Sequence, residues 1–228
     1  MFRVLVADPI EAEGVAALRA GGLEVEQRQG LGEASLCAEL PGFDALLVRS
    51  KTTVTARALE HAARLRLITR AGIGVDNVDL AAASRRGVIV TNVPDATTTT
   101  TAEHAIALLL ALARRIPAAD RHLRGGGFER SRFVGSELAG KTLGIVGLGR
   151  IGRVVADRAL GLKLRVLAHD PFLPTGATPL PGVACVPLAE LLAAADFLTV
   201  HVPLTDATRG MIAARELAAA RRGLRVIN

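Results

Sequence analysis

Lys141-Thr-Leu-Gly-Ile-Val-Gly-Leu-Gly-Arg-Ile-Gly152 is the stretch of this sequence that decides its fold. The apolar run Thr142–Val146 predicts a strand, and a helical pattern begins directly after the glycines. Gly147 permits a tight turn, Gly149 lets the backbone approach a pyrophosphate, and Gly152 allows close packing of the helix on the strand. The N-terminus of the helix would offer free N–H groups to the phosphates. The pattern therefore predicts a dinucleotide-binding turn.

An acidic residue follows at the spacing that such a turn requires. Asp170 ends the next predicted strand, 18 residues beyond Gly152. A carboxylate at this position accepts hydrogen bonds from the ribose hydroxyls and repels a 2′-phosphate. Pro171 follows it, with no arginine to pair with a phosphate, so the expected cofactor is NAD rather than NADP. The alternative is a structural glycine turn with an incidental aspartate, but strand, spacing, helix and acid together favour NAD.

Short apolar runs alternate with helical patterns on both sides of this turn. Such alternation is typical of βαβ units and predicts an α/β fold with two doubly wound parallel-sheet lobes. The predicted strands are Arg3–Ala7, Leu23–Glu26, Ala45–Val48, Arg66–Thr69, Val88–Thr91, Thr142–Val146, Leu164–His169, Phe197–His201 and Leu224–Ile227. The predicted helices between them are Glu11–Ala20, Glu33–Glu39, Ala56–Ala63, Leu80–Arg86, Arg150–Leu160, Leu188–Ala194 and Ala213–Ala220.

A long helix is expected between the two lobes. Five threonines at 97–101 offer caps, and apolar residues continue to Ala113. Pro117 then predicts a kink or a break. The expected domains are therefore a first α/β lobe over residues 1–96 and a Rossmann dinucleotide-binding domain over residues 97–228.

Composition excludes several other classes of protein. The 228 residues carry a net charge of +6, and the basic residues come singly or in pairs with few aromatic neighbours, so no nucleic-acid partner is expected. The longest apolar run, Ala105–Ala113, is much shorter than the roughly 20 residues of a membrane span, so a soluble protein without membrane contact is expected. Two cysteines without metal-ligand spacing suit reduced thiols in a cytoplasmic protein, with no metal site.

Four motifs occur in an order that is specific to one family. They are VRSKT at Val48–Thr52, RAGIGVDNVD at Arg70–Asp79, LAGKTLGIVGLGRIG at Leu138–Gly152 and HVPLT at His201–Thr205. With them the chain resembles the D-isomer-specific 2-hydroxyacid dehydrogenase family over essentially its whole length. The resemblance implies that the lobe at 1–96 is flavodoxin-like and binds substrate, and that the Rossmann domain is cut short at its C-terminus.

The resemblance also assigns residues to the two ligands. On the substrate side it implies Arg49, Ser50, Arg70, Ile73, Gly74 and Thr97, where Thr97 replaces the asparagine usual in the family. On the cofactor side it implies Ile73 near the nicotinamide, Arg150 and Ile151 with the three glycines at the pyrophosphate, Asp170 at the ribose, and Val202 and Pro203 beside the adenosine. Arginine suits a carboxylate or a phosphate because its guanidinium presents a planar fork of donors.

The implied reaction is NAD-dependent oxidation of a small anionic D-2-hydroxy acid, with D-3-phosphoglycerate and serine biosynthesis as the expected substrate and role. The family's catalytic Arg, Glu and His are expected beyond Asn228, so this chain alone is expected to be inactive. A homodimer is expected through the NAD-binding lobe, with Ala102–Ala113 and Leu123–Phe133 as candidate contacts. Two alternatives stay open: an enzyme for glyoxylate, hydroxypyruvate or formate, and a non-catalytic NAD(H)-binding module like the family's corepressors.

Overall fold

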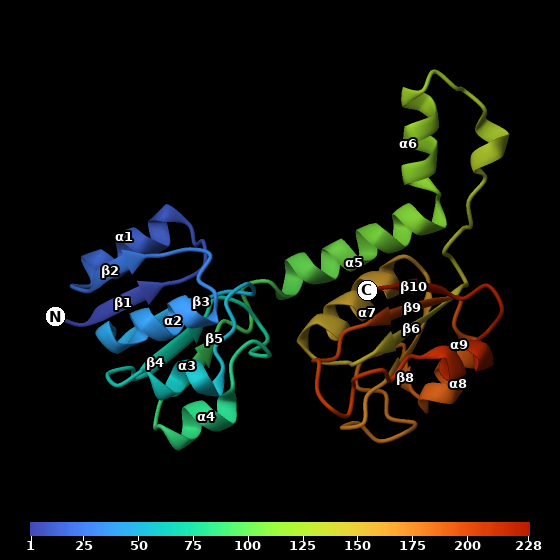
Figure 1. Cartoon of the computed structure of the whole chain (residues 1–228). Coiled ribbons are helices and arrows are strands. Elements are labelled where there is room, and N and C mark those ends of the chain that lie inside the picture. Colours follow the sequence, from blue (N-terminus) through green and yellow to red (C-terminus); the bar gives the residue numbers. More distant parts are fainter. The chain divides into compact units, whose positions relative to one another are not determined.

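The computed structural model describes residues 1–228, which form two compact units, Met1–Thr97 and Thr98–Asn228 (Figure 1). The boundary expected from the sequence lies one residue earlier. Each unit contains one five-stranded sheet in which all neighbouring strands are parallel. The expected α/β class with two doubly wound sheets is therefore confirmed. None of the helices is long and apolar enough to cross a membrane.

The sheet of the first unit has the strand order β2-β1-β3-β4-β5. The order reverses between β1 and β3, and ligands of open α/β sheets bind at the carboxyl ends of the strands near such a reversal. Its strands are β1 (Arg3–Val6), β2 (Glu24–Gln27), β3 (Ala45–Val48), β4 (Leu67–Arg70) and β5 (Ile89–Asn92). Its helices are α1 (Ala12–Ala20), α2 (Glu33–Glu39), α3 (Ala56–Glu60) and α4 (Leu80–Arg85), with a 3₁₀ turn, η1, at Leu40–Gly42.

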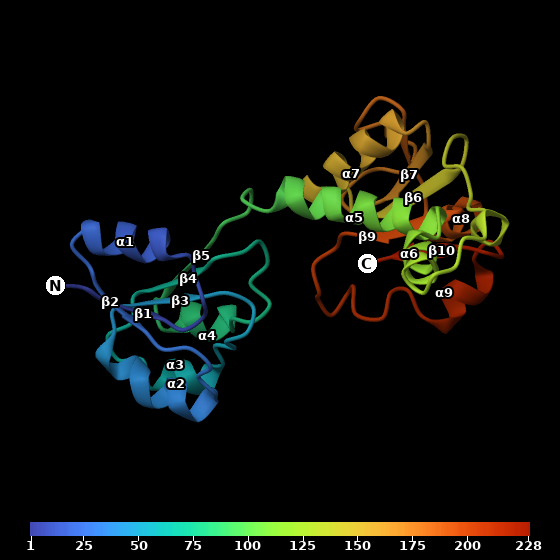
Figure 2. The same ribbon diagram turned by 90° about the horizontal axis from the view of Figure 1, so that it is seen from above.

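Side chains from alternate strand positions build one core on each face of this sheet. Leu5, Leu46 and Ile68 pack against α2, α3 and α4, whereas Val4 and Val6 pack against α1. Figure 2 shows α1 on one side of the sheet and α2 and α3 on the other. Successive residues of a strand point to opposite faces, so these helices bury the inner strands from both sides.

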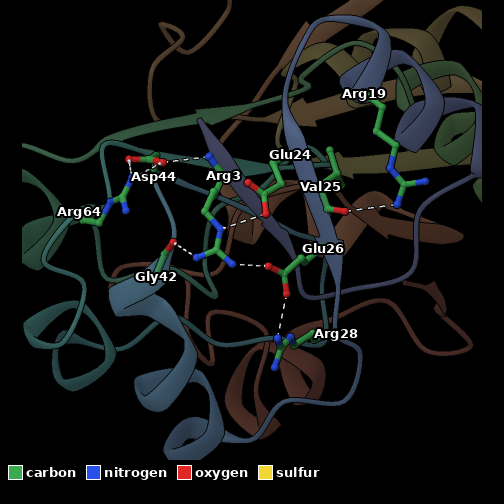
Figure 3. A network of polar contacts seen from close by, with 9 residues as sticks. All are labelled: Arg3, Arg19, Glu24, Val25, Glu26, Arg28, Gly42, Asp44 and Arg64. Atoms are coloured by element: carbon green, nitrogen blue, oxygen red, sulfur yellow. Dashed lines mark hydrogen bonds and ion pairs between the residues drawn. The ribbon is translucent and has the colours of Figure 1, made fainter. Parts of the chain in front are cut away.

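A network of ion pairs lies at the amino end of the first sheet (Figure 3). Arg3, the first residue of β1, pairs with Glu24 at 3.4 Å and with Glu26. Asp44 accepts a hydrogen bond from the backbone N–H of Arg3 at 2.9 Å and pairs with Arg64 at 3.1 Å. The network thus ties β1, β2 and the start of β3 together at the end opposite the one where such sheets bind ligands.

This network is expected to make the stability of the first unit depend on acid pH. Hydrogen bonds from Arg28 and Arg3 lower the pKa of Glu26, and the backbone N–H of Arg3 and the side chain of Arg64 lower the pKa of Asp44. A lowered carboxyl pKa stabilises the folded state above the unfolded pKa, and this stabilisation is lost as pH falls through the folded pKa. The melting temperature should therefore be steady between about pH 6 and 8 and fall below about pH 4.

Glu26→Gln should lower the melting temperature at neutral pH and shrink the difference between neutral and acid pH. Glu60→Gln, at an exposed position at the end of α3, should keep the wild-type profile. Thermal unfolding followed by circular dichroism from neutral to acid pH makes the comparison. A Glu26→Gln profile that coincides with the wild type at every pH would contradict the role given to the network.

The sheet of the second unit has the strand order β10-β9-β6-β7-β8. Read from β8, this is the 3-2-1-4-5 order of a dinucleotide-binding fold. Its strands are β6 (Thr142–Val146), β7 (Arg165–His169), β8 (Val183–Cys185), β9 (Phe197–Val200) and β10 (Arg225–Ile227). Its helices are α5 (Thr98–Ala113), α6 (Ile116–Arg124), α7 (Arg150–Gly161), α8 (Leu188–Ala194) and α9 (Ala214–Ala219), with a 3₁₀ turn, η2, at Arg130–Phe133.

The central strand of the second sheet is β6, and all five of its residues are buried. Leu143 and Ile145 pack with α5 and α7, whereas Val146 packs on the opposite face with α8. At Gly144 the helix α8 comes so close that a Cβ would lie 2.4 Å from a methyl group of Leu191. The end of β6, where the glycine-rich turn begins, is therefore held from both faces.

Two elements of the second unit were missed by the sequence analysis. α5 ends at Ala113, Arg115 has a left-handed backbone (φ 58°), and α6 then begins with Pro117 in its first turn. The expected break is confirmed, but Pro117 also starts a second helix, because the first turn needs no N–H from that residue. Figure 1 shows α6 standing away from the sheet of its unit. The other missed element, β8, has only three residues.

Candidate functional site

The glycine-rich turn joins β6 to α7, and each of its glycines has a separate structural reason. Gly147 has a positive φ of 91°, and a Cβ there would lie 2.9 Å from the backbone carbonyl of His201. A Cβ at Gly152 would lie 2.1 Å from the carbonyl oxygen of Gly147, so the helix meets the turn backbone to backbone. A Cβ at Gly149 would meet no protein atom within 4 Å, so the space beside Gly149 is open to a ligand.

The helix that follows this open space starts without a side-chain cap. Gly149 is the N-cap residue of α7, a helix of 12 residues, and Arg150 and Ile151 stand in its first turn. The N–H groups and the positive dipole end of a helix start favour an anion. Open space and an uncapped helix start thus coincide at the position expected for a pyrophosphate.

Asp170 follows β7, and its carboxylate is fixed beside the same turn. Its Oδ2 accepts a hydrogen bond from the N–H of Leu148 at 2.9 Å, and its Oδ1 accepts one from the N–H of Phe172 at 3.0 Å. Each carboxylate oxygen retains a further lone pair. A carboxylate held in this way can accept hydrogen bonds from the hydroxyls of a ribose next to the turn.

The loop after β9 reaches the turn from the other neighbour of β6. Val202 packs on the turn, since its Cγ1 would lie 2.8 Å from a Cβ at Gly147, and Pro203 follows it as an exposed residue. The ring of His201 lies 3.0 Å from the hydroxyl of Thr199. Burial lowers the pKa of His201, so its ring is neutral at neutral pH. The structure therefore gathers the predicted cofactor-side residues of the second unit around one turn.

These residues fit a dinucleotide such as NAD. The open space at Gly149 and the helix start suit a pyrophosphate, the fixed carboxylate of Asp170 suits a ribose diol, and Val202 offers an apolar wall. The residue after Asp170 is Pro171, which has no charge for a 2′-phosphate. Ile73, the remaining residue expected on the cofactor side, belongs to the first unit.

In the first unit a cleft of about 320 Å³ opens at the carboxyl ends of β1, β3, β4 and β5. Two of the predicted substrate residues, Arg49 and Thr97, line it. The guanidinium of Arg49 is exposed and donates a hydrogen bond to the carbonyl of Pro9 at 3.3 Å. The other lining residues are Ile10, Glu11, Ala71, Gly72, Val93 and Ala96. A cleft of this size has room for a small molecule, and its wall carries the guanidinium of Arg49, which can pair with an acid, together with the carboxyl group of Glu11.

The other predicted substrate residues stand around this cleft without lining it. The guanidinium of Arg70 is held by two backbone carbonyls. Its Nη1 donates to the carbonyl of Gly74 at 2.6 Å, and its Nε donates to the carbonyl of Arg49 at 3.3 Å. Ser50 is exposed next to Arg49. Arg70 therefore joins the loop after β4, which contains Ile73 and Gly74, to the loop after β3.

Three polar residues near the cleft were not singled out from the sequence. Asn92 donates to the carbonyl of Ile73 at 2.6 Å, and Asp8 and Asn77 are buried beside the loop after β3. A usable signal existed for Asp8 and Asn92, because a polar residue at the carboxyl end of a parallel strand lies where such sheets bind ligands. Asn77 lies within a quoted motif, but nothing in the motif indicated which loop it holds.

Comparison with known proteins bears on both units. Residues 106–228 match the family model described as D-isomer specific 2-hydroxyacid dehydrogenase, NAD binding domain. D-3-phosphoglycerate dehydrogenase of Archaeoglobus fulgidus is 46% identical over 227 residues, covering 100% of this chain and 43% of the relative. The human enzyme of the same name is 41% identical over 226 residues, covering 99% of this chain and 42% of the relative. The chain thus spans less than half the length of these curated relatives.

Solved structures agree with the fold of both units. The TT0316 protein from Thermus thermophilus has a TM-score of 0.89 and 38% identity, covering 98% of this chain and 72% of that one. NAD-dependent formate dehydrogenase from Staphylococcus aureus in complex with NAD has a TM-score of 0.86 and 28% identity, with coverage of 98% and 72%. D-lactate dehydrogenase from Aquifex aeolicus, complexed with NAD and lactic acid, has a TM-score of 0.85 and 26% identity, with coverage of 98% and 67%.

Proposed function

We propose that the whole protein oxidises D-3-phosphoglycerate to 3-phosphohydroxypyruvate with NAD, because this chain belongs to the D-isomer specific 2-hydroxyacid dehydrogenase family. The observation that carries the proposal is the glycine-rich turn, with open space at Gly149 and the fixed carboxylate of Asp170 beside it. The choice of substrate follows the curated relatives, which are named for it at 41–46% identity. The proposed role is the corresponding step of serine biosynthesis.

The cofactor, when bound, supplies the acceptor for the hydride that leaves C2 of the hydroxy acid. In the second unit, the turn from Gly147 to Gly152 holds the pyrophosphate through backbone N–H groups, with Arg150 and Ile151 next to it. Asp170 accepts hydrogen bonds from the ribose hydroxyls and disfavours a 2′-phosphate by charge repulsion. Val202 and Pro203 exclude water from one side of the adenosine.

In the first unit, Arg49 and Ser50 bind the anionic groups of the substrate from the loop after β3. Arg70, Ile73 and Gly74 orient the substrate through the neighbouring loop, and Thr97 offers a hydroxyl that both donates and accepts hydrogen bonds. None of the 228 residues is proposed as the base that removes the proton of the 2-hydroxyl.

Steady-state formation of NADH by the whole protein tests this proposal. D-3-phosphoglycerate should give the highest kcat/KM in a panel of compounds to be oxidised. The panel also includes formate and the two hydroxy acids that are formed when glyoxylate and hydroxypyruvate are reduced. Absence of NADH formation with D-3-phosphoglycerate would contradict the proposal. The replacement of the usual asparagine by Thr97 favours another member of the panel as second candidate. NAD binding without turnover of any acid would favour a non-catalytic NAD(H)-binding module.

The protein is further proposed to be a homodimer that pairs through its second unit. Large apolar side chains are exposed along α5, α6 and the segment after α6, which is unusual for a surface that stays in water. They are Leu108, Leu112, Ile116, Leu123, Phe128 and Val134.

The two cysteines, Cys37 and Cys185, are buried and unpaired, which supports a proposed cytoplasmic location.

Light scattering coupled to size-exclusion chromatography tests the dimer. The wild-type chain should show twice its mass of 23.8 kDa. Leu112→Glu should give the monomer mass, because a charge buried in an apolar interface costs on the order of 3 kcal/mol. Leu217→Glu, at an equally exposed leucine of α9, should leave the dimer mass unchanged. A Leu112→Glu chain that remains dimeric would exclude α5 from the interface.

A further inference from the structure

The turn Arg49–Thr52 after β3 is held in place by two buried side chains that come from other parts of the chain. Asp8 follows β1 and is 2% exposed, and Asn77 lies in the segment between β4 and α4 and is 9% exposed. Ser50 and Lys51, between the two ends of the turn, are exposed. Neither Asp8 nor Asn77 is among the residues proposed to contact the substrate.

Asp8 binds the N–H groups at both ends of the turn. Its Oδ2 accepts hydrogen bonds from the backbone N–H of Arg49 at 2.6 Å and of Thr52 at 3.2 Å, and its Oδ1 accepts one from the Thr52 hydroxyl at 2.8 Å. Burial by itself raises the pKa of Asp8, but the hydrogen bonds from Arg49, Thr52 and Lys51 outweigh it and the pKa is lowered. The buried carboxylate is therefore charged, and its charge is satisfied by the turn itself.

Asn77 binds the carbonyl groups of the same two residues. Its Nδ2 donates to the carbonyl of Arg49 at 2.7 Å and to that of Thr52 at 2.6 Å. The reversed amide would place Oδ1 against two carbonyl oxygens at these distances, so the orientation of the amide is determined by its partners. Oδ1 itself is buried and has no hydrogen-bond partner. A buried acceptor without a partner is unfavourable, so the donor side of the amide accounts for its presence here.

The charge of Asp8 separates two explanations of its place beside the cleft. A carboxylate near a site for an anionic substrate repels that substrate, so simple electrostatics predicts that removing the charge strengthens binding. If the carboxylate instead holds the turn in its binding geometry, removing it weakens binding, because Arg49 and Ser50 must then be ordered when the substrate arrives. The two explanations therefore predict opposite changes in substrate affinity when the charge of Asp8 is removed.

We propose that Asp8 and Asn77 are positioning residues, which clamp Arg49 and Thr52 by their N–H and C=O groups and so preset the turn that binds the anionic end of the substrate. The inference rests on the proposed function for the identity of the substrate. The clamp itself rests on the five hydrogen bonds and the burial of both side chains. Neither residue touches the substrate in this account.

Two measurements test the clamp: amide exchange in the 228-residue chain and substrate binding by the whole protein. Asp8→Asn keeps the shape of the side chain but turns an NH₂ group toward N–H donors, so the amides of Arg49 and Thr52 should exchange with solvent about tenfold faster. The dissociation constant for D-3-phosphoglycerate should rise about tenfold at a temperature where circular dichroism shows both chains folded. Asn77→Ala should produce the same pair of changes.

Asp76→Asn is the matched control, because it removes one negative charge from an exposed neighbour of Asn77 and leaves the turn untouched. In Asp76→Asn the amides of Arg49 and Thr52 should exchange with solvent at the wild-type rate. This variant should bind D-3-phosphoglycerate as tightly as the wild type or more tightly. An Asp8→Asn chain that binds as tightly as the wild type, or more tightly, would overturn the clamp. Wild-type exchange rates at Arg49 and Thr52 in Asp8→Asn would also overturn it, without any ligand. A wild-type whole protein that fails to bind D-3-phosphoglycerate would instead contradict the proposed function.

Discussion

Gly149→Ala is expected to weaken NAD binding strongly while leaving the fold intact. The backbone at Gly149 is extended, with a negative φ of −73° that does not require glycine, and a Cβ there would meet no protein atom within 4 Å. The added methyl group would instead stand in the space assigned to the pyrophosphate. An overpacked contact of this kind costs on the order of 2 kcal/mol, or about thirtyfold in the dissociation constant measured by calorimetry.

Two further glycines of α7 provide the contrast. Gly152→Ala would place a methyl group 2.1 Å from the carbonyl oxygen of Gly147, so the backbone must move and both the melting temperature and NAD affinity should fall. Gly161→Ala, near the end of the same helix, meets nothing within 4 Å and should stabilise the chain slightly with unchanged affinity. If Gly149→Ala bound NAD as tightly as Gly161→Ala, the pyrophosphate would not lie at this turn.

Asp170→Asn is expected to produce the second large effect, on affinity and on cofactor choice together. A hydrogen bond to a charged group contributes about 1.5–3 kcal/mol, so NAD affinity should fall by about ten- to a hundredfold. The same change removes the charge that repels a 2′-phosphate, so NADP should lose less affinity than NAD or none. The preference for NAD over NADP should therefore narrow, as read from the two dissociation constants.

Asp157→Asn controls for the general loss of one negative charge from α7. Its side chain is exposed and pairs with Arg158 at 3.0 Å on the surface. This variant should keep both dissociation constants within about twofold, as expected for an exposed ion pair. Equal effects of the two substitutions would contradict the assignment of Asp170 to the ribose.

The cofactor site was predictable because most of the residues that form it lie in one short stretch of sequence. A strand, a glycine-rich turn and a helix are consecutive in sequence, and Gly147 and Gly152 can be interpreted before the structure is known. NAD as the cofactor and the family itself are confirmed by the match of residues 106–228 to the NAD binding domain model. The individual site residues stay predictions, which the substitutions above test.

Other features depend on distances that no local pattern records. Asp8 and Arg49 are 41 residues apart in the sequence, yet their atoms lie 2.6 Å apart, because β1 and β3 are neighbours in the sheet. Arg70 is predicted to bind the substrate, and no local pattern indicated that its guanidinium also donates to the carbonyls of Arg49 and Gly74. The helix α6 was missed because Pro117 indicates the end of one helix and the start of the next equally well.

The central claim is that the second unit binds NAD at the glycine-rich turn, with Asp170 beside the ribose. The most direct test is a titration of NAD into the isotope-labelled 228-residue chain, followed by backbone amide chemical shifts in NMR spectra. Saturable shifts should cluster at residues 147–152, at Asp170 and at Val202, and they should be lost in Gly149→Ala. Saturable binding whose shifts lie elsewhere, or no binding at all, would contradict the central claim.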